Sequence, residues 1–229
     1  MKAVLLIPLA GPMQSWGTRS RFQERDTERE PSKSGVIGLL CAALGRDRNE
    51  PLDDLVALKM GVRVDQEGLL QKDFQTTQDV IVASGKGWEN QISNRYFLSD
   101  AAFLVGLEGE GDMLRHLHKA LANPFWPLFL GRKSHVPSPP TYLHDGLMDG
   151  ADLRSALMNY PLLGRSKKQE KIRLVLESSS ITHESRTDSP ISFSFGRREF
   201  RERFVNTEFL PAEAFPRKED DNVSYKARA

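Results

Sequence analysis

The fold is decided by two apolar stretches near the start of the chain: AVLLIPL at residues 3–9 and, after AGPMQSWG at 10–17 and a charged loop, PSKSGVIGLL at 31–40. The first stretch predicts a buried strand that ends in a Gly/Pro turn. The last predicts a helix that is apolar nearly all round and therefore buried. Ser34 is the expected N-cap of this helix and Gly45 its C-terminal stop.

The start of this helix has two open interpretations. Bare backbone at Gly35 and Gly38, beside Lys33, suits a phosphate, because free amides and the positive end of the helix dipole attract anions. The glycines could equally serve close packing of helix on sheet, and a short glycine pattern alone does not decide. We expect Trp16, in the preceding turn, to be exposed.

The composition is that of a globular protein. The chain has 229 residues, 39% hydrophobic and 28% charged, enough for one large domain or two small ones that share a core. No apolar run approaches the roughly 20 residues of a membrane span, and the start is too short for a signal peptide, so we expect a cytoplasmic protein. The single cysteine, Cys41, lies in the apolar helix and is expected to be a buried small hydrophobe.

The net charge of +1 argues against indiscriminate polyanion binding, but the basic residues bunch in the second half. They form three clusters, at 132–133, 165–173 and 197–203. Any one of them could be an ordinary solvated face, and together they favour an extended polyanion.

A projecting β-hairpin is expected at about residues 73–97, where strand-like arms flank Ser84 to Trp88. It is rich in Thr, Gln and Asn and poor in apolar residues facing one side. We therefore expect it to lean on something outside the domain, either a partner protein or a nucleic acid.

The remaining elements complete an α+β pattern. A helical turn at 51–58, strands at 60–64 and 101–107 and a helix at 111–123 give most of a ferredoxin-like β-α-β-β-α-β order. An apolar strand at 125–130, a helix at 151–157 and strands at 172–176, 191–195 and 203–209 are expected to follow. We expect a domain at 1–125, a smaller β-rich part at 126–215 and a mobile tail at 216–229.

No residues are expected to be catalytic or to bind a metal or cofactor. His116 and His118 are too close in sequence to share a helix face, and no metal-ligand spacing or nucleotide fingerprint occurs. His135 after Lys133, and His144 beside Tyr142 and Asp145, are the only candidates for general acid–base chemistry. Each is better interpreted as a loop histidine.

Binding is the better prediction. A ferredoxin-like sheet presents an open face, and modules of this shape hold single-stranded RNA by stacking bases on aromatics while cations hold phosphates. Trp16, Lys33, Arg132 and Lys133 all lie at ends of predicted elements and could converge there.

Three motifs in order carry a resemblance: AGPMQSWG at 10–17, PSKSGVIGLL at 31–40 and LGRKS at 130–134. Together they resemble the CasD family of type I-E Cascade subunits, within the RAMP superfamily of CRISPR-associated proteins. The similarity runs from residue 1 to about 205. It implies a ferredoxin-like (RRM-like) RAMP domain whose inserted hairpin is the family's thumb, reaching over the guide RNA and kinking it beside a CasC subunit.

The resemblance also implies a non-catalytic subunit that caps the 5′ handle of the crRNA and joins the CasC backbone to the large subunit CasA. Target DNA would be met only through the complex. Matched positions give an RNA-binding set of Gln14, Ser15, Trp16, Lys33, Ser34, Gly35, Gly38, Arg132 and Lys133. In this hypothesis Gly35, Gly38 and Ser34 take a phosphate, the three cations neutralise its neighbours, and Trp16 packs against a base or ribose.

Two alternatives remain open. In type I-C relatives a similar protein cleaves precursor RNA with a Tyr, Lys and His set that has no match in this sequence, and a metal-independent endoribonuclease is the enzyme alternative. The second alternative is a scaffold that contacts mainly other proteins.

Overall fold

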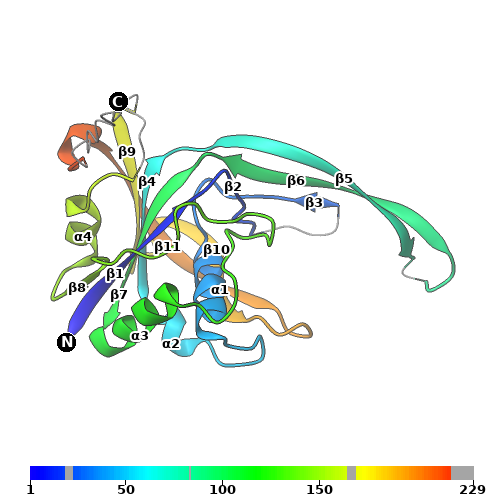
Figure 1. Ribbon diagram of the computed structural model, residues 1–229, viewed down its shortest axis with the longest axis horizontal. Coiled ribbons are helices and arrows are strands. Elements are labelled where there is room, and N and C mark those ends of the chain that lie inside the picture. The colour runs from blue at the N-terminus through cyan, green and yellow to red at the C-terminus, as the bar shows by residue number, and fades with distance from the viewer. Residues whose placement is uncertain (19–22, 83, 164–168, 218–229) are drawn as a thin grey trace, which may run out of the picture.

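The core of the protein is one seven-stranded sheet (Figure 1). A computed structural model describes residues 1–18, 23–82, 84–163 and 169–217. The strands follow the order β10 (Glu184–Ser192), β11 (Glu199–Pro211), β9 (Lys171–Ser178), β4 (Lys59–Gln66), β7 (Ala102–Glu110), β1 (Lys2–Ala10) and β8 (Leu147–Asp149). Every neighbouring pair is antiparallel. The fold is therefore α+β and dominated by antiparallel pairing.

Strand β1 lies inside this sheet and is buried on both faces. Successive side chains of a strand point to opposite faces. Ile7 and Leu9 pack in the cluster that includes the helices α1 (Lys33–Leu44) and α3 (Gly111–Ala122), whereas Val4 and Leu6 pack in a second cluster with α4 (Leu153–Asn159). The expected open face is thus wrong at the centre of the sheet, because apolar side chains on both faces of β1 require cover on both sides.

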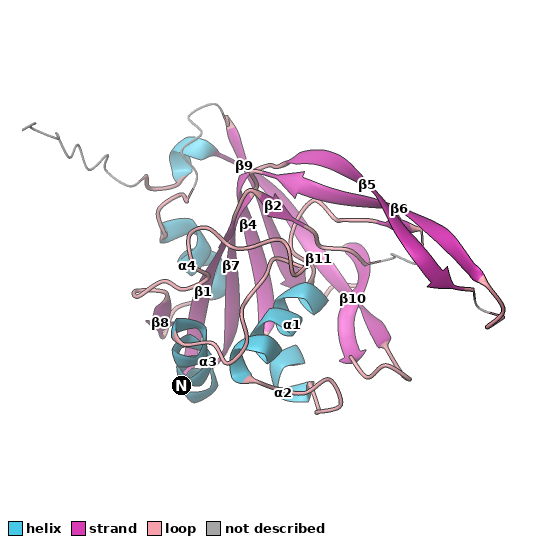
Figure 2. Ribbon diagram, turned by 45° about the vertical axis from the view of Figure 1, so that its right-hand side comes forward, coloured by secondary structure: helices cyan, strands magenta, loops and turns pink. Residues whose placement is uncertain are grey.

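Helix α1 packs beside α3, with the short α2 (Asp53–Val56) nearby (Figure 2). It ends as predicted, at Gly45, whose φ of 73° lies in the left-handed region that favours glycine. Further on, a single 3-10 turn, η1 (Ala212–Ala214), follows β11. None of the helices within the described ranges has the length and apolar character that a membrane crossing requires.

The predicted hairpin is confirmed and is longer than expected. Strands β5 (Leu69–Ile81) and β6 (Trp88–Ser99) form an arm that projects from the body (Figure 1). The short β2 (Met13–Gln14) and β3 (Glu24–Arg25) pair with β6 near the body. The AGPMQSWG turn is therefore part of the base of the hairpin.

Several predicted elements need correction. Residues 125–130, all described, form no strand; instead the amides of Phe125 and Trp126 donate to carbonyls of α1, 3.0 Å away in both cases. The strand predicted at 191–195 is the end of β10, which stops at Ser192. Most of the predicted tail, from 218, and the basic residues at 165–168 lie outside the described residues.

The C-terminal strands extend the main sheet, since β9 pairs with β4. The division of the chain at residue 125 stays a prediction.

Candidate nucleic-acid interface

The first motif folds inward. The side-chain amide of Gln14 is fully buried and donates to the carbonyls of Leu9, at 3.1 Å, and Ala101, at 2.8 Å. The indole of Trp16 is 1% exposed and donates to Oε1 of Gln14 at 3.2 Å. The prediction of an exposed Trp16 is therefore wrong, because its polar nitrogen finds a buried partner and its ring joins the core. Gln14 holds the turn in place.

The N-terminus of α1 already holds an anion of this chain. Ser32, not Ser34, is the N-cap, and its hydroxyl accepts from the amide of Gly35 at 3.3 Å. The backbone amide of Lys33 donates to a carboxylate oxygen of Asp188 at 2.8 Å. The amides of Lys33 and Gly35 thus have acceptors within the chain, and the phosphate role of Gly35 stays a prediction.

Lys33 is an internal cation. Its ammonium lies 2.9 Å from both carboxylate oxygens of Glu177, and the residue is 3% exposed. Burial lowers the pKa of Lys33, and the charge of Glu177 acts in the opposite direction. The charge of Lys33 is therefore paired inside the protein, and its expected role in neutralising a bound phosphate stays a prediction.

The two glycines of α1 have different surroundings. A Cβ at Gly35 would come 2.8 Å from Cε3 of Trp16, whereas a Cβ at Gly38 would meet nothing within 4 Å. Close packing therefore explains Gly35. Gly38 instead leaves bare helix backbone open to the surface.

A cleft of about 670 Å³ runs along this open side of α1. Five of the predicted RNA-binding residues line it: Ser15, Trp16, Ser34, Gly35 and Gly38. Four do not: Gln14, Lys33, Arg132 and Lys133. The resemblance thus indicated one wall of a real cleft, but its predicted cations lie elsewhere.

Two arginines and several aromatic residues of the cleft were not among the predicted RNA-binding residues, although Arg198 belongs to the basic cluster at 197–203. Arg48 lies after α1, and its guanidinium is 4.7 Å from the ring centre of Phe195. Arg198, also in the lining, stands 5.5 Å from the ring centre of Phe200. Trp126 completes the wall and is 56% exposed. In the sequence, the aromatic run at 125–129 and the basic cluster at 197–203 were the features that could have indicated this part of the cleft.

The cleft is not uniformly basic. Arg46 makes a two-pronged ion pair with Asp54, at 2.6 and 2.7 Å, and Asp47 is part of the lining. Arg48 and Arg198 therefore carry its unneutralised positive charge within the described residues. Cys41 also lines the cleft, but burial raises the pKa of its thiol to about 11, so it stays protonated and unreactive at neutral pH.

The third motif packs against the first. The amide of Ser15 donates to the carbonyl of Leu130 at 3.0 Å, and Gly131, at φ 89°, leaves no room for a side chain beside the backbone of Ser15. Arg132 and Lys133 follow at the base of the hairpin, half-buried and exposed respectively. The first and third motifs therefore lie together at the base of the hairpin.

A second group of cations surrounds Arg132. Its guanidinium donates to the carbonyl of Arg25 at 3.2 Å. Burial lowers the pKa of Arg132 and the nearby charges of Arg95 and Arg25 lower it further, whereas Asp73 and Asp26 act in the opposite direction. A bound anion would relieve the repulsion among the three arginines that these two carboxylates only partly offset.

His135 is buried, and the residues beside His144 in sequence have other partners. Nδ1 of His135 has no hydrogen-bond partner among the described residues, and burial and the charge of Arg132 lower the pKa of His135. The ring of Tyr142 lies 4.8 Å from that of His118, and Asp145 accepts from the hydroxyl of Tyr160. In the described ranges no three His, Cys, Asp or Glu side chains gather as a metal site.

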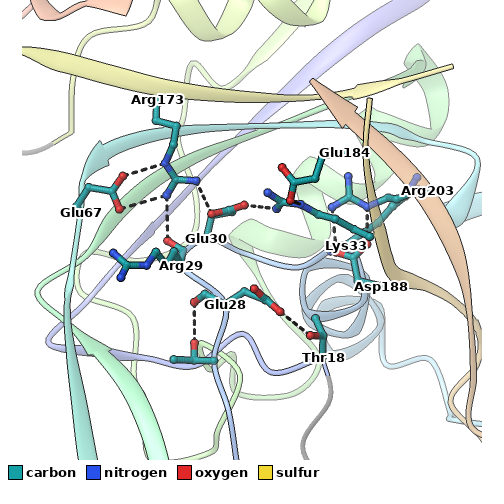
Figure 3. A network of polar contacts seen from close by, with 12 residues as sticks. Thr18, Glu28, Arg29, Glu30, Lys33, Glu67, Arg173, Glu184, Asp188 and Arg203 are labelled. Carbon is teal, nitrogen blue, oxygen red and sulfur yellow. Dashed lines mark hydrogen bonds and ion pairs between the residues drawn. The ribbon is translucent and has the colours of Figure 1, made fainter. Parts of the chain in front are cut away.

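Two of the basic clusters are partly structural (Figure 3). Arg203 pairs with Asp188 at 2.6 Å, and Arg173 pairs with Glu30 at 2.5 Å and with Glu67 at 2.9 Å. Arg186 also contacts Glu30. These residues join the loop before α1 to the C-terminal strands, so they are not available to an outside polyanion.

The fold and the cleft define an α+β protein of antiparallel sheets with an aromatic and arginine-lined groove, consistent with the RAMP proteins of CRISPR systems. The model of the CRISPR-associated protein family Cas_Cas5 matches residues 4–206, and the chain belongs to this family.

Three proteins illustrate the similarity. The CRISPR system Cascade subunit CasD of Escherichia coli (strain K12) is 33% identical over 180 residues, which cover 72% of this chain and 80% of that protein. A solved structure described as a Cas protein is 52% identical, with a TM-score of 0.77 over 93% of this chain and 98% of its own. A chain of a CRISPR RNA-guided surveillance complex is 32% identical, with a TM-score of 0.76 over 93% and 92%. None of these three descriptions names a catalytic activity.

Proposed function

We propose that the protein is a non-catalytic crRNA-binding subunit of a type I-E Cascade complex, acting in the cytoplasm in antiviral defence. In this role it caps the 5′ handle of the crRNA and joins the CasC backbone to CasA, and meets target DNA only through the complex. The similarity to a Cascade subunit and to a chain of an RNA-guided surveillance complex supports this assignment.

The ferredoxin-like core is part of the proposal. Strands β4, β7, β1 and β8 are neighbours in that order, with all pairs antiparallel, and α1 and α3 lie together beside them. In chain order this is the arrangement 2-3-1-4 of a β-α-β-β-α-β unit. The hairpin β5–β6 lies between β4 and β7 in the chain, and we assign it as the thumb. The boundaries at 125 and 215 remain part of the same proposal.

The cleft along α1 carries the proposal of RNA binding. Single-stranded RNA is held by aromatic faces that take bases and by cations that take phosphates, and here Trp126 supplies a face while Arg48 and Arg198 supply charges. The bare backbone at Gly38 allows a ribose or phosphate to approach the helix closely. Ser15, Trp16 and Ser34 also line the cleft.

Arg132 and Lys133 extend this surface toward the hairpin. Their turn packs on Ser15, so a strand leaving the cleft past Ser15 reaches the arginine group at the hairpin base. Gln14 and Lys33 remain in the proposal as positioning residues, because they fix the turn and the start of α1 without facing the cleft.

The test is binding of a labelled handle RNA to the assembled complex. Trp126→Ala and Arg198→Ala should each weaken binding about tenfold, the order of one lost stacking or phosphate contact. Arg115→Ala is the matched control, because Arg115 is half-buried, pairs with Asp112 and Asp149 and does not line the cleft. Equal effects of the three substitutions would contradict the assignment of the cleft.

A cleavage assay separates this proposal from the endoribonuclease alternative. Labelled repeat RNA incubated with the protein in EDTA should stay intact. A defined product would contradict the non-catalytic role. In cells, Arg132→Ala with Lys133→Ala should weaken assembly on crRNA without accumulation of precursor.

A further inference from the structure

One of the segments that line the cleft comes from the edge of the main sheet. The connection between β10 and β11, residues 193–198, supplies Phe193, Phe195 and Arg198, whereas α1 supplies another group that includes Gly38. Strand β10 ends the strand order of the sheet, and β11 is its one neighbour among the described strands. The pairing of strands alone therefore does not fix how close β10 lies to α1.

Asp188 of β10 joins this edge strand to the start of α1 (Figure 3). Its Oδ2 accepts from the backbone amide of Lys33, the first residue of α1, at 2.8 Å. Its two carboxylate oxygens also accept from the guanidinium of Arg203 on β11, at 2.6 and 2.9 Å. Asp188 is 3% exposed. One buried carboxylate thus connects β10, β11 and α1, and its negative charge suits the positive end of the helix dipole.

The pairing of β10 with β11 is irregular around this carboxylate. Between its pairings at Arg186 and Ser189, β10 has one residue more than β11, and Asp188 lies in this interval. A second such β-bulge follows between Pro190 and Ser192. A bulge bends its strand and changes the direction of the side chains beside it. The irregular segment of β10 therefore starts at the contact with α1 and leads directly to the connection that lines the cleft.

The other contacts of the connection are weaker or do not reach the helix. Phe195 follows Asp188 by seven positions and is 88% exposed; its contact with the exposed Arg48 is a cation–π pair, which is weak at such a site. Arg186 contacts Glu30, which precedes the helix. Within the described residues, Asp188 is the only side chain of β10 that forms a hydrogen bond with α1 itself.

We infer that Asp188 is a positioning residue of the RNA-binding cleft: it holds the edge strand β10 on the start of α1 and thereby sets where Phe195 and Arg198 meet the RNA. The inference rests on the proposed function, because it requires that the cleft binds RNA. Asp188→Asn should release the strand, since the amide has one acceptor oxygen for three donors and adds an N–H group that faces them.

Asp65 provides a matched control. This carboxylate of β4 is also 3% exposed and has the same set of partners. It accepts from Nε and Nη2 of Arg63 at 2.6 and 2.8 Å, and from the backbone amide of Leu163 at 2.7 Å. None of these three residues lines the cleft. Asp65→Asn therefore disrupts the same kind of buried contact at a place where the RNA is not expected.

Binding of a labelled handle RNA to the assembled complex, compared at equal folded fraction, tests the inference. Asp188→Asn should weaken binding about fivefold to tenfold, close to the loss for Arg198→Ala, because a displaced arginine no longer contacts its phosphate. Asp65→Asn should lower the free energy of unfolding by a similar amount but change the affinity for RNA less than about twofold, as expected for independent sites.

A double-mutant cycle separates positioning from a general loss of structure. In a chain that already carries Phe195→Ala and Arg198→Ala, Asp188→Asn should cost less than about twofold in affinity, because the side chains that it positions are gone. Arg203→Lys is a milder variant for the case that Asp188→Asn does not fold. It keeps the charge but not the two-pronged contact, and should weaken binding about twofold to threefold.

Three results would overturn the inference. They are an unchanged affinity for RNA in Asp188→Asn and Arg203→Lys, an equal loss of affinity in Asp65→Asn, and an undiminished effect of Asp188→Asn when residues 195 and 198 are already replaced. If Arg198→Ala itself leaves the affinity unchanged, the proposed role of the cleft fails instead, so the two failures are distinguishable.

Discussion

The indole of Trp16 occupies the space that a side chain at Gly35 would need: a Cβ there would come within 2.8 Å of Cε3 of the ring. The Gly/Pro turn of the first motif and the start of α1 in the second motif therefore pack directly against each other. The third motif closes on the same unit, since Ser15 bonds to the carbonyl of Leu130. Three segments of the chain therefore pack together along the cleft.

Gly35→Ala and Gly38→Ala should shift stability in opposite directions. At position 35 the new methyl meets the buried indole, and overpacking costs about 1–3 kcal/mol, more than the helix propensity gained. At position 38 the methyl meets nothing within 4 Å, so the propensity gain of about 0.5–1 kcal/mol remains. Urea denaturation measures both. A gain in the free energy of unfolding for Gly35→Ala would contradict the packing.

Lys33→Met should be strongly destabilising. Removal of one partner from a buried ion pair costs about 3–5 kcal/mol, because Glu177 is left without its counter-charge. Glu177→Gln in the Lys33→Met background should recover part of the loss. Lys133→Ala is the control: this lysine is exposed, and its removal should change stability by less than about 0.5 kcal/mol. Urea denaturation of the wild type, Lys33→Met, the double variant and Lys133→Ala under one set of conditions measures these differences in unfolding free energy.

The contribution of Glu30 to stability should depend on pH. Burial alone would raise the pKa of Glu30, but the charges and hydrogen bonds of Arg173 and Arg186 outweigh it and hold the pKa below its ordinary value of 4.5. A lowered carboxyl pKa stabilises the folded state above the unfolded pKa, and this stability is lost as the pH falls through the folded pKa.

The measurement compares wild type with Glu30→Gln in urea at several pH values. The difference in unfolding free energy should be the same at about pH 7 and pH 6 and should narrow below about pH 4, where the wild type loses its advantage. Glu213→Gln, at an exposed residue, should show a small difference at every pH. If the difference in unfolding free energy between wild type and Glu30→Gln grows as the pH falls, the pKa of Glu30 is raised rather than lowered in the folded state.

The fold was predictable where one local signal is sufficient. Residues 3–9 are continuously apolar and Gly45 suits a left-handed stop, so β1 and the end of α1 follow from the sequence. Residues 125–130 are equally apolar, but a short apolar run has no period that separates strand from irregular chain. Their backbone bonds to carbonyls of α1, a partner that local reasoning does not show.

The site was predictable only in part for the same reason. The partner of Lys33 is Glu177, 144 positions away, and nothing near Lys33 in sequence indicates that its charge is neutralised. Arg48 and Arg198 lie 150 positions apart in the chain, and only the packing of β10 beside α1 brings them to one cleft. The sequence motifs thus indicated residues that line the cleft, whereas Arg48 and Arg198 could be assigned to it only from the three-dimensional structure.

The salt dependence of RNA binding should reveal which arginines contact phosphates. Each phosphate contact on a single strand contributes about 0.7 to the slope of log K against log salt concentration, because a condensed counterion is released. Arg48→Ala and Arg198→Ala, which remove the unneutralised charges of the cleft, should each reduce that slope by about this amount. Lys33→Met and Arg115→Ala should leave the slope unchanged, since both side chains are ion-paired and neither faces the cleft. A reduced slope for Lys33→Met, at equal folded fraction, would mean that Lys33 leaves Glu177 to contact the RNA.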